Sequence, residues 1–198
     1  MYLRMVSSHG PFQTACDLRG TENFLMDIAL NPAFTQALLE RITDTLQGLL
    51  HQALQMGGQH FDMVELPGDD YASNKGLIIS PAMFCTFIKP CILRLVTTIK
   101  EYNPTIRVML HSDGAIAALL PEMIDMGVDV LHPLEPLPAT NMIEVKVRYG
   151  GQISFLGGID ISHADGQPRG CHCGGAYAPG TNGARRRLHP GASQSPAG

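Results

Sequence analysis

The stretch IRVMLHSDGAIAALLPEMIDMGVDVLHPLEP, residues 106–136, contains a complete strand–helix–strand unit. Residues 106–111 and 128–133 are short apolar segments, which predicts two buried strands. Residues 115–127, between them, carry apolar side chains at helical spacing and end at a glycine, which predicts a helix. Two strands joined through a helix by short loops are typical of a parallel β/α unit.

The same alternation extends over residues 1–163. Asn31 and Pro32 are typical of the N-cap and first position of a helix, and Pro90 predicts a kink or a break in another. Strands are predicted at 60–66, 106–111, 128–133 and 153–160, and helices at 31–57, 80–102, 115–127 and 140–151. This pattern predicts an α/β fold with about four parallel β/α units.

Composition narrows the class of protein. A chain of 198 residues that is 44% hydrophobic can bury a core, and a formal charge of −4 argues against general nucleic-acid binding. No apolar run reaches about 18 residues, so no membrane span is expected. The start lacks the apolar stretch of a signal peptide, and five cysteines at irregular spacing do not suggest a disulfide framework. We expect a cytoplasmic protein that binds neither nucleic acid nor a membrane.

Polar and titratable side chains follow each predicted strand. In a parallel barrel the carboxyl ends of the strands meet at one mouth, where catalysis takes place. In strand order, these residues are Glu65, Asp69, Asp70 and Tyr71; His111, Ser112 and Asp113; His132 and Glu135; and Asp160 and His163. We therefore expect an active-site face at these strand ends.

Chemistry suggests a role for each group. Glu65 lies in an apolar strand, and a buried carboxylate needs a partner or a function. His111 and Asp113 could share a metal ion or a proton. The predicted catalytic residues are Glu65, Asp69, Asp70 and Tyr71, the predicted substrate-binding residues are His132, Glu135 and Asp160, and the predicted metal ligands are His111 and Asp113.

Structural roles remain open for several of these residues. Asp69 or Asp70 could cap backbone amides in the loop GDDY. His132, which precedes Pro133, could be a hydrogen-bonded structural histidine. His111 with Asp113 supplies only two ligands, so this pair alone could bind no metal at all.

Four stretches of the sequence, in order, resemble the uroporphyrinogen decarboxylase superfamily. They are GPFQTACDLRGTENFLMDIALNP (10–32), VELPGDDYASNKGLIISPAMFCTFIKP (64–90), HSDGAIAALLPEMIDMGVDVLHPLEP (111–136) and VRYGGQISFLGGID (147–160). The resemblance implies a (β/α)₈ TIM barrel, of which this chain would supply a part. The superfamily includes decarboxylases, zinc-dependent corrinoid methyltransferases and many barrel proteins of unassigned substrate. The stretches GDDYAS and ISP most resemble the methyltransferase-like or unassigned branch.

Departures from the family patterns bear on the choice between these activities. Asp17 stands where the decarboxylases have a substrate-binding tyrosine, Leu66 stands where they have a serine, and their N-terminal arginine-bearing segment has no counterpart here. In the methyltransferases a His-x-Cys pair binds zinc. Here His111 matches the histidine, but Asp113 replaces the cysteine, which suggests a zinc of altered character, another divalent metal, or none.

The resemblance therefore implies metal-assisted, corrinoid-type methyl transfer to a small-molecule substrate in the intact parent protein, with a corrinoid supplied by a partner protein. The alternatives are uroporphyrinogen decarboxylation in tetrapyrrole biosynthesis, which needs no metal, and a truncated product without activity. A barrel typically needs about 250 residues, so we expect the fragment to be poorly stable alone.

Residues 164–198 differ in composition from the rest of the chain. From Asp165 onward there is no Ile, Val, Phe or Met, and Gly, Pro, Arg and Ser abound, which predicts a disordered tail. A codon reading shifted by one nucleotide permits APGGGYILAP, a motif that the resemblance implies should follow. We expect the tail to be out of frame, so that Cys171, His172 and Cys173 form no metal site.

Overall fold

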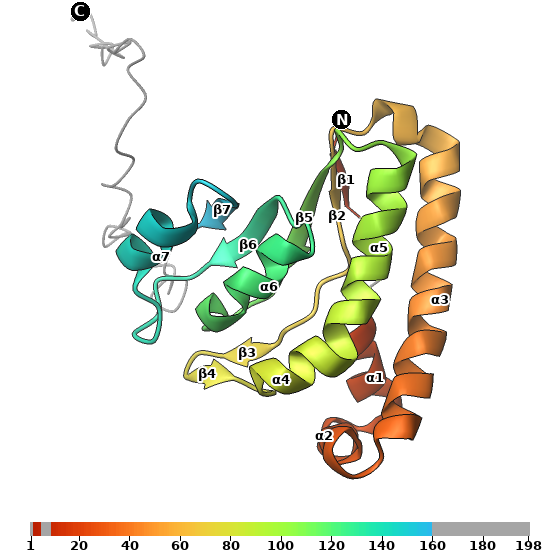
Figure 1. The fold of residues 1–198 in the computed structure, drawn as a ribbon, viewed down its shortest axis with the longest axis vertical. Coiled ribbons are helices and arrows are strands. Elements are labelled where there is room, and N and C mark those ends of the chain that lie inside the picture. Colours follow the sequence, from red (N-terminus) through yellow and green to blue (C-terminus); the bar gives the residue numbers. More distant parts are fainter. Residues whose placement is uncertain (1, 5–8, 160–198) are drawn as a thin grey trace, which may run out of the picture.

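A computed structural model describes residues 2–4 and 9–159 (Figure 1). Its centre is a five-stranded parallel sheet in the order β1-β2-β5-β6-β7. The strands are β1 (Tyr2–Arg4), β2 (Met63–Glu65), β5 (Arg107–His111), β6 (Val130–Leu134) and β7 (Ser154–Gly157). The predicted parallel α/β architecture is confirmed, and β1 is a strand that the sequence pattern did not predict. The predicted tail lies outside the described residues.

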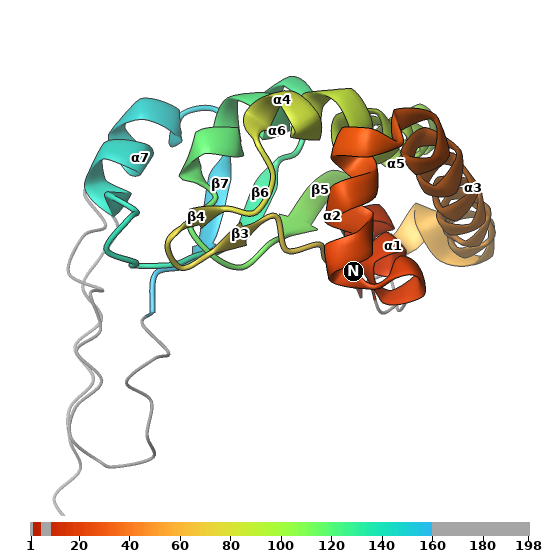
Figure 2. The same ribbon diagram turned by 90° about the horizontal axis from the view of Figure 1, so that it is seen from below.

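Helices connect the strands and cover the sheet. In Figures 1 and 2 the long helices α3 and α5 lie side by side, and α5, α6 and α7 lie along one side of the strands. The helices are α1 (Pro11–Arg19), α2 (Thr21–Leu30), α3 (Pro32–Gly57), α4 (Pro81–Met83), α5 (Lys89–Tyr102), α6 (Leu120–Asp125) and α7 (Met142–Tyr149). Short elements are the turns η1 (Gly58–His60), η2 (Phe84–Ile88) and η3 (Ala117–Leu119) and the hairpin of β3 (Ala72–Ser73) and β4 (Gly76–Leu77).

One hydrophobic core joins the sheet to these helices. Val108 and Leu110 of β5 and Leu131 of β6 are fully buried, as are Leu95 and Ile99 of α5. Burial of each such side chain contributes about 1.5–3 kcal/mol to folding. The core therefore fixes the positions of the strands, and with them the residues at the strand ends.

Two helix details differ from the sequence prediction. Asn31 occupies the N-cap position of α3 but does not cap it, because its side-chain amide donates to Asp27 Oδ1 at 2.8 Å instead. Of the two effects predicted for Pro90, the break does not occur, because one helix runs from Pro81 to Tyr102. The π-helical turn η2 ends two residues before Pro90. Such a turn shifts the backbone hydrogen bonds of the helix, next to a proline that has no N–H to donate.

The helix Pro81–Tyr102 is long and apolar enough to cross a membrane by length and composition, and it is the one such helix among the described residues. Within the fold, its apolar residues Ile92, Leu95 and Ile99 are fully buried. A core helix of a globular domain passes the same test, so this helix is weak evidence for a membrane span.

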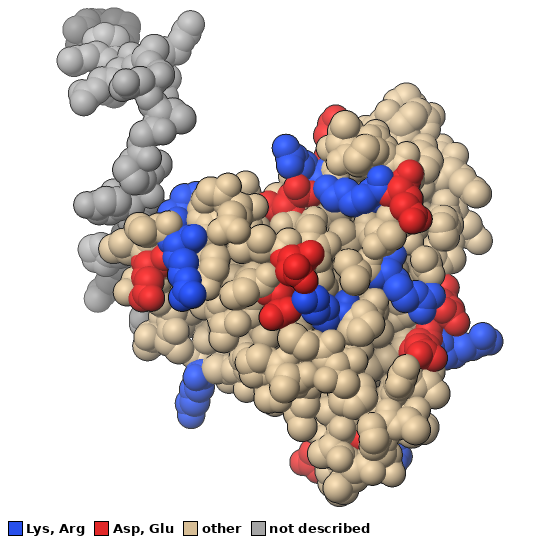
Figure 3. Space-filling model, in the orientation of Figure 1, with Lys and Arg blue, Asp and Glu red and all other residues tan. Residues whose placement is uncertain are grey.

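Several charged side chains on the face shown in Figure 3 lie beside a side chain of opposite sign. Lys89 of α5 bridges Glu122 and Asp125 at 2.6 and 2.7 Å, which ties α5 to α6. Arg94 of α5 pairs with Asp44 of α3 at 2.7 Å. Ion pairs at the protein surface stabilise weakly, by about 0–1 kcal/mol each.

Candidate functional site

The register of three neighbouring strands brings Glu65, His111 and His132 together. Glu65 is paired with Met109, and His111 is paired with His132. Side chains along a strand alternate between faces, so Met109 and His111 are on the same face of the sheet. Because Glu65 lies beside Met109, His111 is on the same face as Glu65 and two residues further along the strand direction. The side chain of Glu65 is buried, and both histidines are half-buried. The carboxyl ends of β2, β5 and β6 therefore form one cluster.

The two imidazoles contact each other directly. His111 Nδ1 lies 2.9 Å from His132 Nδ1, and the ring centroids are 5.1 Å apart. One ring must donate and the other accept at this distance. Gly68 leaves room for the His111 ring, since a Cβ at Gly68 would lie 2.9 Å from His111 Cδ2. The loop after β5 is tied to the backbone of β6 by a hydrogen bond from Ser112 N to His132 O at 2.9 Å.

Two groups at this edge have the composition of a metal site. Glu65, His111 and His132 offer ligand atoms that all lie within 4.8 Å of one another, as do Asp70, His111 and Asp113. Two imidazoles and a carboxylate suit zinc and related divalent ions. His111 belongs to both groups, with Nδ1 toward His132 and Nε2 at 3.7 Å from Asp113 Oδ1.

The loops beyond the strands are fixed by carboxylates that accept backbone hydrogen bonds. Asp70 Oδ1 accepts from Asp113 N at 2.9 Å, and Glu135 Oε2 accepts from Gly114 N at 2.6 Å. Gly114 has a φ of +90°, and a Cβ there would lie 2.6 Å from the carbonyl oxygen of Ala72. Asp70 and Glu135, predicted as catalytic and substrate-binding residues, thus hold the loop that carries Asp113.

Asp69 lies apart from this cluster, in the interior. Its carboxylate accepts from Phe12 N at 3.0 Å and from Gln13 N at 2.7 Å, so it caps the amino end of α1 across a long sequence separation. Burial raises its pKa to about 7, although the two backbone hydrogen bonds and one from Tyr71 act in the opposite direction. The capping role that the sequence left open for this residue is the one that the structure has.

Tyr71 belongs to the same interior network. Its hydroxyl donates to Asp69 Oδ2 at 3.0 Å, and its ring, which is fully buried, contacts Phe12 and Phe84. Burial raises the pKa of this hydroxyl well above its usual range. The geometry gives Tyr71 a packing and positioning role, and the predicted catalytic role of Asp69 and Tyr71 has no direct support from these contacts.

Sequence reasoning missed part of the arrangement. His132, predicted to bind substrate, shares the cluster of Glu65 and His111. The sequence contains a signal for this grouping, because both histidines lie at the ends of consecutive predicted strands. Ser112, which the sequence shows as one of several polar residues after a strand, is buried, and its Oγ accepts from Tyr71 N at 3.2 Å. Asp160 lies outside the described residues.

Comparisons with known proteins agree with this architecture. A family model described as uroporphyrinogen decarboxylase (URO-D) matches residues 5–162. Among solved structures, the chain is similar to a methyltransferase from Methanosarcina mazei, with 20% sequence identity and a TM-score of 0.59. The match covers 75% of this chain and 40% of that chain, so this chain spans well under half of that protein's length. No curated protein matches the sequence. The similarity confirms the predicted partial α/β barrel.

Proposed function

The chain belongs to the uroporphyrinogen decarboxylase family, and from this premise we propose that it is the metal-holding part of a methyltransferase-like enzyme. The observation that carries the proposal is the convergence of Glu65, His111 and His132, with ligand atoms within 4.8 Å of one another. The methyltransferase of similar fold supports the choice of reaction class.

The donor set fits a divalent cation. Catalytic zinc sites commonly have three protein ligands, two histidines and a glutamate among them, and leave a position open for substrate. Glu65 would supply the negative charge from a buried position, and the two histidines would bind as neutral imidazoles. When bound, the metal would act as a Lewis acid that lowers the pKa of a thiol or of another substrate group.

The surrounding residues orient this cluster. The contact between the two Nδ1 atoms, 2.9 Å apart, holds the two imidazole rings beside each other. Asp113 is exposed, and its Oδ1 lies 3.7 Å from Nε2 of the same His111 whose Nδ1 faces His132. Asp70 holds Asp113 through the backbone contact described above, so this carboxylate stays close to His111.

The proposed reaction moves a methyl group from a corrinoid, carried by a partner protein, to a small thiol substrate in the cytoplasm. A sulfur–carbon bond forms, the cobalt–carbon bond breaks with its electron pair left on cobalt, and the thiol proton is released. Uroporphyrinogen decarboxylation is the second candidate, favoured by the description of the matching family model. It requires no metal at the cluster.

The test asks whether the chain demethylates a corrinoid with zinc bound or decarboxylates uroporphyrinogen without a metal. With methylcobalamin and a simple thiol, the full chain reconstituted with zinc should demethylate the corrinoid, and Glu65→Gln should abolish that activity. Glu101→Gln, an exposed glutamate on α5, is the matched control and should retain it. Turnover of uroporphyrinogen by the metal-free chain, with no demethylation by the zinc form, would replace methyl transfer with decarboxylation.

A further inference from the structure

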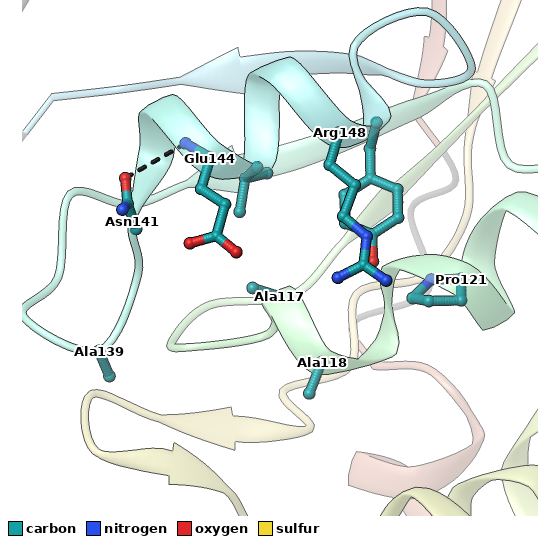
Figure 4. Close-up of a pocket in the computed structure, with 9 residues that line it drawn as sticks. Ala117, Ala118, Pro121, Ala139, Asn141, Glu144 and Arg148 are labelled. Carbon is teal, nitrogen blue, oxygen red and sulfur yellow. Dashed lines mark hydrogen bonds between the residues drawn. The ribbon is translucent and has the colours of Figure 1, made fainter.

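A cavity of about 450 Å³ lies between α7 and the segment formed by η3 and α6 (Figure 4). Its wall on the η3–α6 side consists of Ala117, Ala118 and Pro121, whose side chains are too small to fill the space between the two elements. This volume is typical of sites for small molecules. None of its lining residues belongs to the two metal-ligand groups, so the cavity is a separate feature.

Two opposite charges on α7 face this cavity. Figure 4 shows the carboxylate of Glu144 and the guanidinium of Arg148 both pointing from α7 toward η3. Residues four apart on a helix are neighbours, and a Glu–Arg pair at this spacing commonly forms an ion pair. Within the described part of the chain, neither side chain forms an ion pair with the other or with a third residue.

Tyr149 restrains the arginine. The guanidinium carbon of Arg148 lies 5.1 Å from the centroid of the Tyr149 ring, a cation–π contact that leaves the N–H groups of the guanidinium available. Asn141 begins α7 and accepts a hydrogen bond from Glu144 N at 3.2 Å, which fixes the amino end of the helix. A carboxylate and a guanidinium are thus presented a helical turn apart, above an apolar wall.

We propose that this cavity binds a small zwitterion of the α-amino acid type. The ligand's carboxylate accepts from the forked N–H groups of Arg148, and its ammonium donates to Glu144. A short aliphatic side chain then packs against Ala117, Ala118 and Val145. Because Glu144 and Arg148 are exposed, each pair alone is weak, and binding requires both charges of the ligand.

The test uses L-valine as the probe and observes amide shifts of α7 by NMR on the full chain. L-valine should bind, whereas N-acetyl-L-valine, which lacks the ammonium, and L-valinamide, which lacks the carboxylate, should bind at least about tenfold more weakly. Equal binding of all three compounds, or no binding of L-valine, overturns the proposal.

Variants distinguish the two charges from the cavity itself. Arg148→Gln and Glu144→Gln should each weaken L-valine binding at least about tenfold, and Ala118→Leu should abolish it by filling the space. Arg41→Gln, at an exposed arginine of α3, is the control and should bind as the parent does. Circular dichroism verifies that each variant is folded, and unchanged binding by folded Arg148→Gln overturns the proposal.

Discussion

Asp69 and Asp70 are adjacent in the chain but act on different parts of the molecule. Asp69 points inward and caps α1, and Asp70 points toward the strand-end cluster and holds the backbone of Asp113. The difference is one of burial, since Asp69 is 1% exposed. Burial raises the pKa of the Asp69 carboxyl group to about 7, a pH at which an ordinary aspartate is fully ionised.

Asp69 should make the free energy of unfolding depend on pH. Its pKa in the folded chain is about 7, above the ordinary 3.8, so the folded state retains a proton that the unfolded state releases. The stability that this group contributes is fully present below pH 3.8, and it is lost as the pH rises to about 7. Asp69→Asn should flatten the dependence by on the order of 1–3 kcal/mol between about pH 5 and about pH 8.

Urea denaturation of both proteins at these pH values measures the effect. The quantity to compare is the slope of unfolding free energy against pH, because the substitution also removes the helix cap and lowers stability at every pH. Parallel pH profiles for the parent and Asp69→Asn would show that the carboxyl group has an ordinary pKa in the fold.

At the scale of elements, α3 contains a glycine with no structural role. Gly48 lies in the middle of this helix, and a Cβ there would meet nothing within 4 Å. Alanine loses less backbone entropy than glycine on forming a helix, so Gly48→Ala should stabilise the chain by about 0.5–1 kcal/mol. Thermal unfolding checks this, and a lowered melting temperature would contradict it.

In the loop after β5, by contrast, replacing a glycine with alanine should lower the stability of the chain. Gly114 has a positive φ and lies against the backbone of Ala72, so Gly114→Ala should destabilise the chain by about 1–3 kcal/mol and displace Asp113. Gly151→Ala, where a Cβ has open space, is the matched control and should change stability by less than about 0.5 kcal/mol. Similar effects of the two substitutions would argue against the described loop.

Helix and strand positions followed from local patterns, and the exceptions have local causes. Apolar spacing predicted α3 because one face of this helix meets the core. The turn η2 was not predictable, since it depends on how the backbone adjusts ahead of Pro90. Strand β1 has only three residues and becomes visible through its pairing with β2, which a local pattern does not reveal.

As far as the structure describes the chain, the sheet ends at β7, and exposed apolar side chains lie there. In the described part of the chain β7 pairs with β6 alone, and Leu156 and Ile159 are 52% and 56% exposed. Open, apolar strand edges favour association. The chain should therefore self-associate, and Leu156→Asp should shift it toward monomer.

Sedimentation velocity over a range of protein concentrations tests this expectation. Leu49→Asp, at a leucine of α3 that is 47% exposed, is the matched control and should leave association unchanged. A monomeric parent, or equal effects of the two substitutions, would show that the β7 edge is not the contact surface.

The candidate site was predictable as a region and not as a set of contacts. Parallel strands bring their carboxyl ends together, so Glu65, His111 and His132 could be expected at one edge. Which of them touch depends on the strand register, and the reach of Asp69 to α1 depends on the tertiary fold. For that reason the sequence paired His111 with Asp113 as ligands, whereas the structure adds a second group through His132.

The proposed function requires that Glu65, His111 and His132 together hold one divalent cation. The most direct measurement is a titration of the full chain with Co²⁺, followed by visible absorption and compared with His132→Ala and with His51→Ala, an exposed histidine of α3. The parent and His51→Ala should show the absorption of a Co²⁺ site with imidazole ligands, and Zn²⁺ should displace it. Folded His132→Ala should lack this absorption. Absence of that signal in the parent, or its persistence in His132→Ala, would contradict the assigned ligands.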